Sequence, residues 1–157
     1  MDINDYLIDQ ADKDWGTFLR GWMPPLPPSF TLWLVKRFGD VFVVLEDDKS
    51  VHMLDVGAGT FVRVADDRSH FADLLDRNDN AANWLLIPLV DACRAAGMAL
   101  NASQCYGFKI PPILGGKYEV ENVEPTDLSV HYSFLGDIYT QTKDLPDGTR
   151  IKTVVVD

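Results

Sequence analysis

The stretch that decides the fold is residues 41–64, which read VFVVLEDDKSVHMLDVGAGTFVRV. Residues 41–45 are all β-branched, aromatic or aliphatic, which is typical of a buried strand. The polar residues that follow predict a turn, residues 51–56 predict a second strand, and the Gly-Ala-Gly after it predicts another turn. Residues 60–64 form a third strand pattern. Because both connections are too short for a crossover, the strands are expected to be antiparallel neighbours in a β-meander.

Upstream of the meander, the sequence predicts helices and a proline-rich linker. Apolar residues spaced by three or four positions over residues 1–23 predict two short helices broken near Asp12. Residues 23–28 read MPPLPP, and proline removes a backbone donor and restricts its predecessor, so these residues predict a short extended linker. A further helix is predicted from Pro28 to Gly39, with proline in its first turn and glycine as its stop.

Downstream of the meander, the apolar spacing changes to three and four, which predicts helices. Residues 71–75 mark one helix, and residues 81–96 mark a second helix that contains Pro88 and stops at Gly97. A proline inside a helix removes a hydrogen bond and clashes with the preceding turn, so a kink is expected there.

The last third of the chain mixes loop and helix patterns. Residues 105–118 are rich in glycine and proline and predict an irregular, ordered loop. A helix is predicted to start at residues 125–127 and to run to Thr142, followed by a turn at 145–148 and an edge strand at 151–156. The whole pattern predicts an α+β fold, in which an antiparallel β-meander is packed with helices.

Length and charge narrow the class of protein. The 157 residues suit a single α+β domain at 28–157 behind an N-terminal helical segment and linker at 1–27. The 24 acidic and 14 basic residues give a net charge of −10, which argues against direct nucleic-acid binding because phosphates are neutralised by Lys and Arg. The acidity favours a basic protein partner, and it is equally consistent with a role in solubility alone.

The sequence predicts a cytoplasmic protein without membrane contact. It has no apolar run near the length of about 20 residues that a bilayer span needs. Its first residues, MDIND, are acidic and lack the apolar region of a secretory signal. Its two cysteines, Cys93 and Cys105, make no disulfide framework.

One glycine motif raises the alternative of a methyltransferase. Residues 54–60 read LDVGAGT and look like the glycine-rich loop that binds S-adenosylmethionine. In such enzymes a helix begins directly after the glycines. Here a strand pattern follows, so Gly57 and Gly59 are predicted to form a hairpin turn instead.

A second alternative is a cysteine hydrolase. Cys105 and His131 could form a nucleophilic pair, with Asp127 or Asp137 orienting the imidazole. No nucleophile motif surrounds Cys105, and a free cysteine is commonly a small buried apolar residue. The sequence therefore favours a protein that is not an enzyme.

Residue types that bind metals are scattered along the chain. Cys93 and Cys105 are twelve residues apart and lack the close pairing of zinc ligands. Asp47 and Asp48, followed by Asp55, do not have the spacing of a calcium loop. The three histidines are His52, His70 and His131. No metal and no cofactor are expected.

Two groups of acidic residues are the candidates for contact with a partner. Asp73 and Asp76 are three residues apart on one predicted helix, and Asp79 follows them. Glu46, Asp47 and Asp48 crowd a predicted hairpin turn. Such groups are either solvated faces or the surface that an inhibitor presents to a basic enzyme.

The most unusual stretch is residues 104–118, QCYGFKIPPILGGKY, which is either a packed loop or a rigid recognition surface. Together with residues 122–149, it resembles the C-terminal domain of type VI secretion DNase immunity proteins, catalogued earlier as a domain of unknown function. The similarity is strong over about residues 104–151. The positions quoted for it, with structural or recognition roles, are Cys105, Tyr106, Gly107, Phe108, Pro111, Pro112, Gly115, Gly116, Tyr118, His131, Gly136, Gln141, Pro146 and Gly148.

The resemblance divides the main domain into two parts. Residues 67–157 correspond to the immunity-type C-terminal part, and residues 28–66 resemble a GAD-like module distantly similar to SMI1/KNR4 immunity proteins. It implies an SMI1/KNR4-like immunity architecture and a non-enzymatic protein that binds a cognate effector toxin. Since the named members neutralise DNases, a basic nuclease is the expected partner, blocked at its active or DNA-binding surface. The alternative is an intracellular adaptor or regulatory module of SMI1/KNR4 type with no toxin partner.

Overall fold

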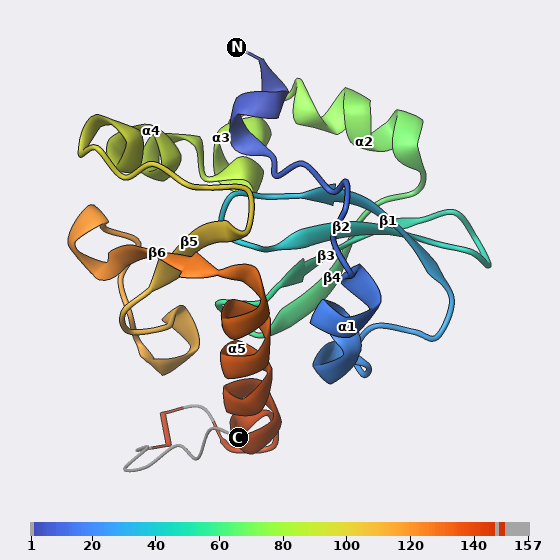
Figure 1. Cartoon of the computed structure of the whole chain (residues 1–157). Helices are drawn as coiled ribbons and strands as arrows, with labels where there is room; N and C mark the ends of the chain where they lie inside the picture. Colours follow the sequence, from blue (N-terminus) through green and yellow to red (C-terminus); the bar gives the residue numbers. More distant parts are fainter. Residues whose placement is uncertain (1, 147, 150–157) are drawn as a thin grey trace.

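The computed structural model, which describes residues 2–146 and 148–149, contains the predicted antiparallel meander (Figure 1). Its four-stranded sheet has the order β1-β2-β3-β4, with every neighbouring pair antiparallel. The strands are β1 (Phe30–Val35), β2 (Val41–Leu45), β3 (Val51–Asp55) and β4 (Thr60–Ala65). With the five α-helices that accompany this sheet in the described residues, the structure confirms the predicted α+β fold class.

The helix predicted from Pro28 to Gly39 was wrong, because β1 occupies this stretch. β1 pairs with β2 from Phe30 opposite Leu45 to Val35 opposite Val41, with one irregularity in register. Its apolar residues fit both a helical and an alternating pattern, and pairing with the neighbouring strand decides between them. Gly39, with φ +85°, lies in the β1–β2 turn instead of ending a helix.

The helices after the meander are α2 (Arg68–Leu75), α3 (Asn80–Leu85) and α4 (Ile87–Ala95). α2 confirms the helix predicted at 71–75. The single kinked helix predicted at 81–96 is two helices, because Leu86 adopts a left-handed conformation with φ 53° and ψ 43°. Pro88 then lies in the first turn of α4, where its missing N–H has no helical partner to lose.

The C-terminal part contains two strands that the sequence did not predict. β5 (Gln104–Phe108) and β6 (Val123–Asp127) pair antiparallel, so the irregular loop predicted from residue 105 begins only after Phe108. Between them lie two short 3-10 helices, η3 (Pro112–Leu114) and η4 (Val120–Asn122). The predicted C-terminal helix is confirmed as α5 (Leu128–Thr142). The edge strand predicted at 151–156 lies outside the described residues.

The N-terminal segment is less helical than predicted and packs into the fold. It contains η1 (Ile3–Tyr6), α1 (Trp15–Leu19) and η2 (Arg20–Trp22). Only the second of the two predicted helices forms; the first is the 3-10 turn η1, and residues 7–10 then run beside β1. The linker predicted to be extended turns back instead, with the Leu26 N–H donating to the Trp22 carbonyl at 2.8 Å.

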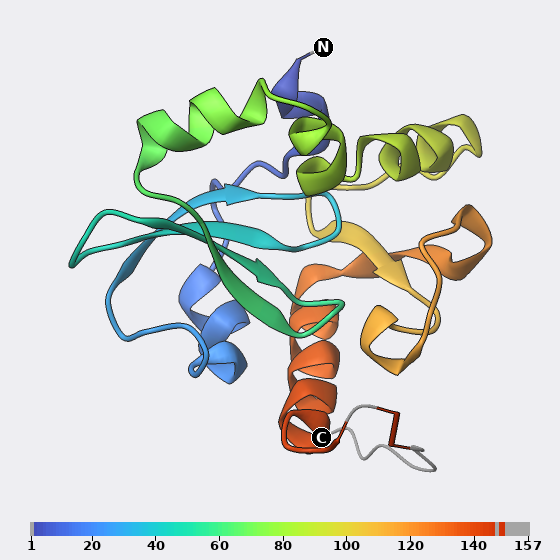
Figure 2. The same ribbon diagram turned by 180° about the vertical axis from the view of Figure 1, so that it is seen from behind.

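Both faces of the four-stranded sheet are covered. α2 and α3 lie over one face, and α1 and α5 lie against the other (Figures 1 and 2). Phe42 and Val44 belong to the core on the first side, whereas Val41 and Val43 belong to the core on the second side. Burial on both faces explains why β2 is apolar without interruption. None of the described helices is both long and apolar enough to cross a bilayer.

Candidate functional site

The six acidic candidates are all exposed. Glu46, Asp47 and Asp48 form the turn between β2 and β3, while Asp73, Asp76 and Asp79 lie on α2 and in its connection to α3. The β2–β3 turn projects beyond the end of the sheet, beside the start of α2, in both views (Figures 1 and 2). The structure therefore places the two groups on one side of the molecule, at the turn and along the helix that follows β4.

An arginine links the β2–β3 turn to the segment between β4 and α2. Arg63 on β4 lies 3.4 Å from Asp48 through Nη1 and 2.9 Å from Asp66 through Nη2, and Asp66 lies directly after β4, two residues before α2. Asp67 caps α2, because its Oδ1 accepts the His70 N–H at 2.8 Å. Asp66 and Asp67 were not among the predicted candidates, although two adjacent acids just before an apolar helical pattern are a common helix start.

The surface keeps an excess of negative charge. We define the acidic surface as Glu46, Asp47, Asp48, Asp66, Asp67, Asp73, Asp76 and Asp79. Between residues 46 and 79 these eight acids stand against four bases, Lys49, Arg63, Arg68 and Arg77. Hydrogen bonds from the Ser50 hydroxyl and N–H lower the pKa of Asp48, so its carboxylate is charged at neutral pH. The surface can attract a cationic partner over a Debye length.

The cysteine–histidine pair considered for catalysis is buried. The His131 side chain, on α5, donates from Nε2 to the Phe38 carbonyl at 2.9 Å, and burial lowers its pKa to about 4. Cys105, on β5, is fully buried, and burial raises the pKa of its thiol. A neutral imidazole and a protonated thiol inside the core serve packing and hydrogen bonding, because the thiolate is the reactive form of cysteine.

Three consecutive carbonyls of the β1–β2 turn join it to the C-terminal part. The Arg37 carbonyl accepts the Tyr106 N–H at 2.8 Å, and the Phe38 carbonyl accepts His131 Nε2. The Gly39 carbonyl accepts the Tyr132 hydroxyl at 2.5 Å. Strand β5 and helix α5 are thus fixed to the sheet through one short turn.

The glycine motif at residues 57–59 is a hairpin turn, as predicted. The Gly59 N–H donates to the Asp55 carbonyl at 2.8 Å, and Asp55 Oδ1 accepts the Ala58 N–H at 2.9 Å. Gly59 has φ +71°, which glycine adopts without strain. Strand β4 begins at once, so the helix that a cofactor loop requires is not formed here.

No sequence pattern predicted a group of buried charges at the β1–β2 turn. Lys36 Nζ lies 3.3 Å from Asp40 Oδ2, and both side chains are almost completely buried. Asp40 also accepts the Val56 N–H at 2.8 Å, which joins the β1–β2 turn to the end of β3. Burial, and then the negative charge of Asp40, raise the pKa of Asp55 to about 7. The group holds the β1–β2 turn against the end of β3, at one end of the sheet.

The residues that carry the family resemblance divide into three classes of exposure. Cys105, Tyr106, Gly107, Pro111, His131 and Gly136 are buried; Phe108, Pro112 and Gly116 are half-buried; Gly115, Tyr118, Gln141, Pro146 and Gly148 are exposed. The buried members lie mainly on β5 and α5, where they fill the core between these elements and the sheet. Most members of this set therefore have structural contacts.

The loop between β5 and β6 is closed by an asparagine that the site prediction left out. Asn122 accepts the Ile110 N–H through Oδ1 and donates from Nδ2 to the carbonyls of Ile110 and Lys117, all at 2.9 Å. Gly116 lies against the Ile110 carbonyl inside this clamp. The clamp gives the glycine- and proline-rich loop one fixed path.

We expect Gly116→Ala to lower the free energy of unfolding by about 2 kcal/mol, because a Cβ there would overlap the Ile110 carbonyl oxygen. Gly115→Ala is the matched control: its Cβ would meet no atom within 4 Å, and φ +91° leaves a cost of about 1 kcal/mol. Urea denaturation of the two variants measures the difference. Equal losses would show that the clamp around Gly116 yields without cost.

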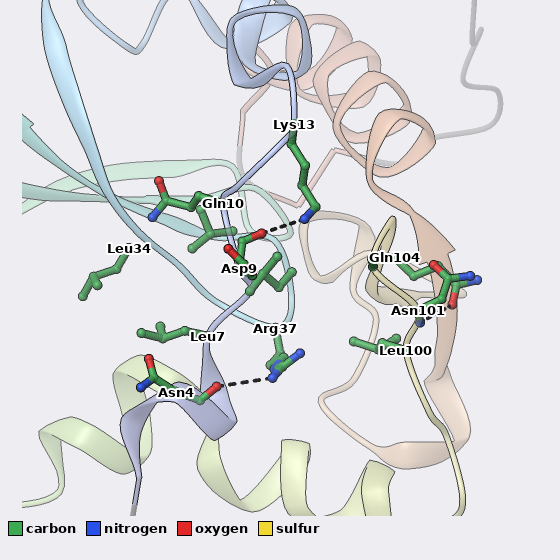
Figure 3. A pocket seen from close by; sticks show the side chains of 13 residues that line it. Asn4, Leu7, Asp9, Gln10, Lys13, Leu34, Arg37, Leu100, Asn101 and Gln104 are labelled. Atoms are coloured by element: carbon green, nitrogen blue, oxygen red, sulfur yellow. Dashed lines mark hydrogen bonds between the residues drawn. The ribbon is translucent and has the colours of Figure 1, made fainter.

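A hollow of about 600 Å³ lies between residues 4–13, the end of β1 and residues 100–104 (Figure 3). Lys13 and Arg37 point into it, but both bind the chain itself. Lys13 Nζ donates to the Asp9 carbonyl at 2.7 Å, and Arg37 Nη2 donates to the Asn4 carbonyl at 3.3 Å. The described residues contain no group of three His, Cys, Asp or Glu placed to hold a metal ion. We assign no ligand to this hollow.

Residues 65–139 match the family model of the C-terminal domain of the type VI secretion system (T6SS) immunity protein Tdi1. The match runs from the end of β4 almost to the end of α5. No curated protein matches the chain. The predicted similarity of residues 28–66 to GAD-like and SMI1/KNR4-like modules lies outside the match and stays a prediction.

The match implies an immunity protein that binds an effector of the T6SS, and it suggests a role other than catalysis. Residues 65–139 are thus similar to the C-terminal domain of type VI secretion immunity proteins of the Tdi1 family.

Proposed function

We propose that this protein neutralises a DNase effector of the T6SS by covering its active or DNA-binding surface. The observation that carries the proposal is the match of residues 65–139 to an immunity family. The charge of the chain, −10, supports a basic partner. A nuclease must bind phosphates with Lys and Arg, so an acidic inhibitor complements the surface that the enzyme uses for DNA.

The acidic surface is the part of the molecule that we propose faces the nuclease during encounter. Its eight carboxylates lie on two neighbouring elements, the β2–β3 turn and the α2 region, and Arg63 offsets only part of their charge. Complementary charge raises the rate of association more than it raises the final affinity. The surface would therefore determine how fast the complex forms.

Co-expression with the effector encoded beside its gene tests the proposal. We expect the protein to restore growth to cells that produce the effector, to co-elute with it, and to stop degradation of DNA by the purified effector. If growth is not restored and no complex forms, the proposal fails, and the adaptor alternative without a toxin partner becomes the better description. Rescue without any DNA degradation by the effector alone would keep immunity and remove the DNase assignment.

Reversal of two charges tests the role of the acidic surface. We expect Asp73→Lys combined with Asp76→Lys to lower the association rate constant about tenfold at low salt and to weaken its salt dependence. Both side chains are exposed, and a cation at Asp76 suits the end of α2, so the fold should be kept. Stopped-flow mixing with the inactivated effector measures the rate.

The control for this variant has the same change in net charge elsewhere. Glu124→Lys combined with Asp144→Lys alters two exposed acids outside the acidic surface. We expect the control to change the rate by less than about twofold, because screening confines the effect to nearby charges. Equal effects of the two double variants would mean that net charge, and not this surface, steers the encounter.

A further inference from the structure

A groove of about 510 Å³ separates α3 and α4 from residues 118–121. In both views η4 lies directly beside α4 (Figures 1 and 2). The apolar part of the groove is lined by Ala82, Leu86, Leu89, Ala92, Tyr118 and Val120. The groove is open because Ala82 and Ala92 have short side chains, and larger residues at these positions would fill it.

The walls of this groove are held by the core. Leu89 is 8% exposed, and Leu86 and Val120 pack against the same buried cluster. Tyr118 is 47% exposed, yet its ring lies edge-on to Phe108 with centroids 5.4 Å apart. An exposed aromatic ring that is already positioned can contact a partner with little further loss of conformational freedom.

The floor of the groove contains a residue in an unfavourable conformation. Leu86 is left-handed, which side chains other than those of Asn and Asp seldom adopt, and it forms the break between α3 and α4. A continuous helix would avoid this strain. Such outliers persist where the surrounding structure enforces them, and they are frequent at binding sites.

The rim of the groove is acidic. Glu119 and Glu121 are exposed, and no described cation forms an ion pair with either carboxylate. Lys117 is exposed nearby and offsets part of this charge. The groove thus combines an apolar floor with a carboxylate rim, which complements an apolar side chain flanked by cations.

We propose that this groove is the docking site for one aromatic or long aliphatic side chain of the effector, flanked by Arg or Lys. The inference rests on the proposed function and names the contact that anchors the complex. Every residue that lines the groove lies within residues 65–139, the segment that identifies the immunity family. A second copy of this chain is a poorer occupant, because it would bring two acidic rims together.

Filling the groove tests the proposal with the complete protein and the inactivated effector encoded beside its gene. Ala92→Trp places an indole in the groove and should weaken the complex at least 100-fold in titration calorimetry. Ala95→Trp adds the same side chain at an exposed position of the same helix, outside the groove, and should change Kd less than threefold. Circular dichroism verifies that both variants fold, and Ala82→Trp replaces Ala92→Trp if that variant does not.

Charge reversal at the rim provides a second, independent readout. Glu121→Lys should weaken the complex at least tenfold, whereas Glu124→Lys, an exposed acid on β6 outside the groove, should leave Kd within threefold. Wild-type affinity in the folded Ala92→Trp and Glu121→Lys variants would overturn the docking site and leave the proposed function intact. No binding by the wild-type protein would overturn both. A wild-type dimer that Ala92→Trp dissociates would assign the groove to a second copy instead.

Discussion

Replacement of Trp22 by alanine should lower the free energy of unfolding by about 3–5 kcal/mol, the range for removing a large buried aromatic side chain. Trp22 is completely buried between the N-terminal segment and α5. Its ring centroid lies 5.0 Å from that of Tyr139, and its Nε1 donates to the Tyr132 carbonyl at 3.2 Å. Alanine would leave a cavity and would remove the indole donor from the Tyr132 carbonyl.

The neighbouring residue supplies the control. Met23 is 42% exposed, so Met23→Ala should cost less than about 0.5 kcal/mol. Urea denaturation followed by circular dichroism compares both variants with the wild type, because the signal then does not depend on tryptophan. A loss below about 1 kcal/mol for Trp22→Ala would mean that residues 1–27 do not unfold together with the sheet and α5.

Asparagine at position 55 should make the stability of the protein depend on pH. Burial lowers the pKa of His131 in the folded protein to about 4, against 6.5 for a free imidazole. Its contribution to the free energy of unfolding is therefore present above pH 6.5 and is lost as pH falls toward 4. The pKa of Asp55 in the folded protein is raised to about 7, against 3.8 for an ordinary Asp side chain. Its contribution to the free energy of unfolding is therefore present below pH 3.8 and is lost as pH rises through 7. With changing pH the two contributions to the free energy of unfolding change in opposite directions, so in the wild type they nearly cancel.

Between pH 6.5 and 4.5 each of these two groups changes the free energy of unfolding by about 2 kcal/mol. The wild type should therefore be almost equally stable at both pH values with respect to these groups. Asp55→Asn keeps an oxygen for the Ala58 N–H and removes the titration, so it should lose about 2 kcal/mol more than the wild type over the same interval. Urea denaturation at three pH values measures this difference, in which the effects of the other carboxylates cancel. Parallel pH curves would show that Asp55 is ionised in the folded protein.

The parts of the fold that could be predicted are those whose information is local. Strands β2, β3 and β4 combine β-branched residues with short polar or glycine turns, and α2 and α5 have apolar residues at helical spacing only. β1 could not be assigned, because its apolar residues satisfy both spacings and the choice depends on pairing with β2. β5 and β6 contain Gly107 and Pro125, which are poor strand formers, so only their mutual pairing reveals them.

In the candidate site, too, some features could be predicted from the local sequence and others depend on contacts between distant residues. The exposure of the six acidic candidates follows from their charge alone, since unpaired carboxylates are seldom buried. The burial of Lys36 and Asp40 depends on the turn that brings them together and on the elements that cover it, and no local pattern reports this. The groove beside α4 depends on the break at Leu86, whereas the sequence indicated only a kink near Pro88.

The three successive carbonyls of the β1–β2 turn have a consequence for the evolution of specificity. They accept hydrogen bonds from Tyr106, His131 and Tyr132, all within the segment that identifies the family, while the turn itself lies outside it. Recombination that exchanged only residues 65–139 between two immunity genes would separate these donors from the turn shaped to receive them. Hybrid proteins should stay folded only when residues 30–41 are inherited with that segment. New toxin specificities would therefore arise more readily by point substitution on the exposed surface than by exchange of half of the gene.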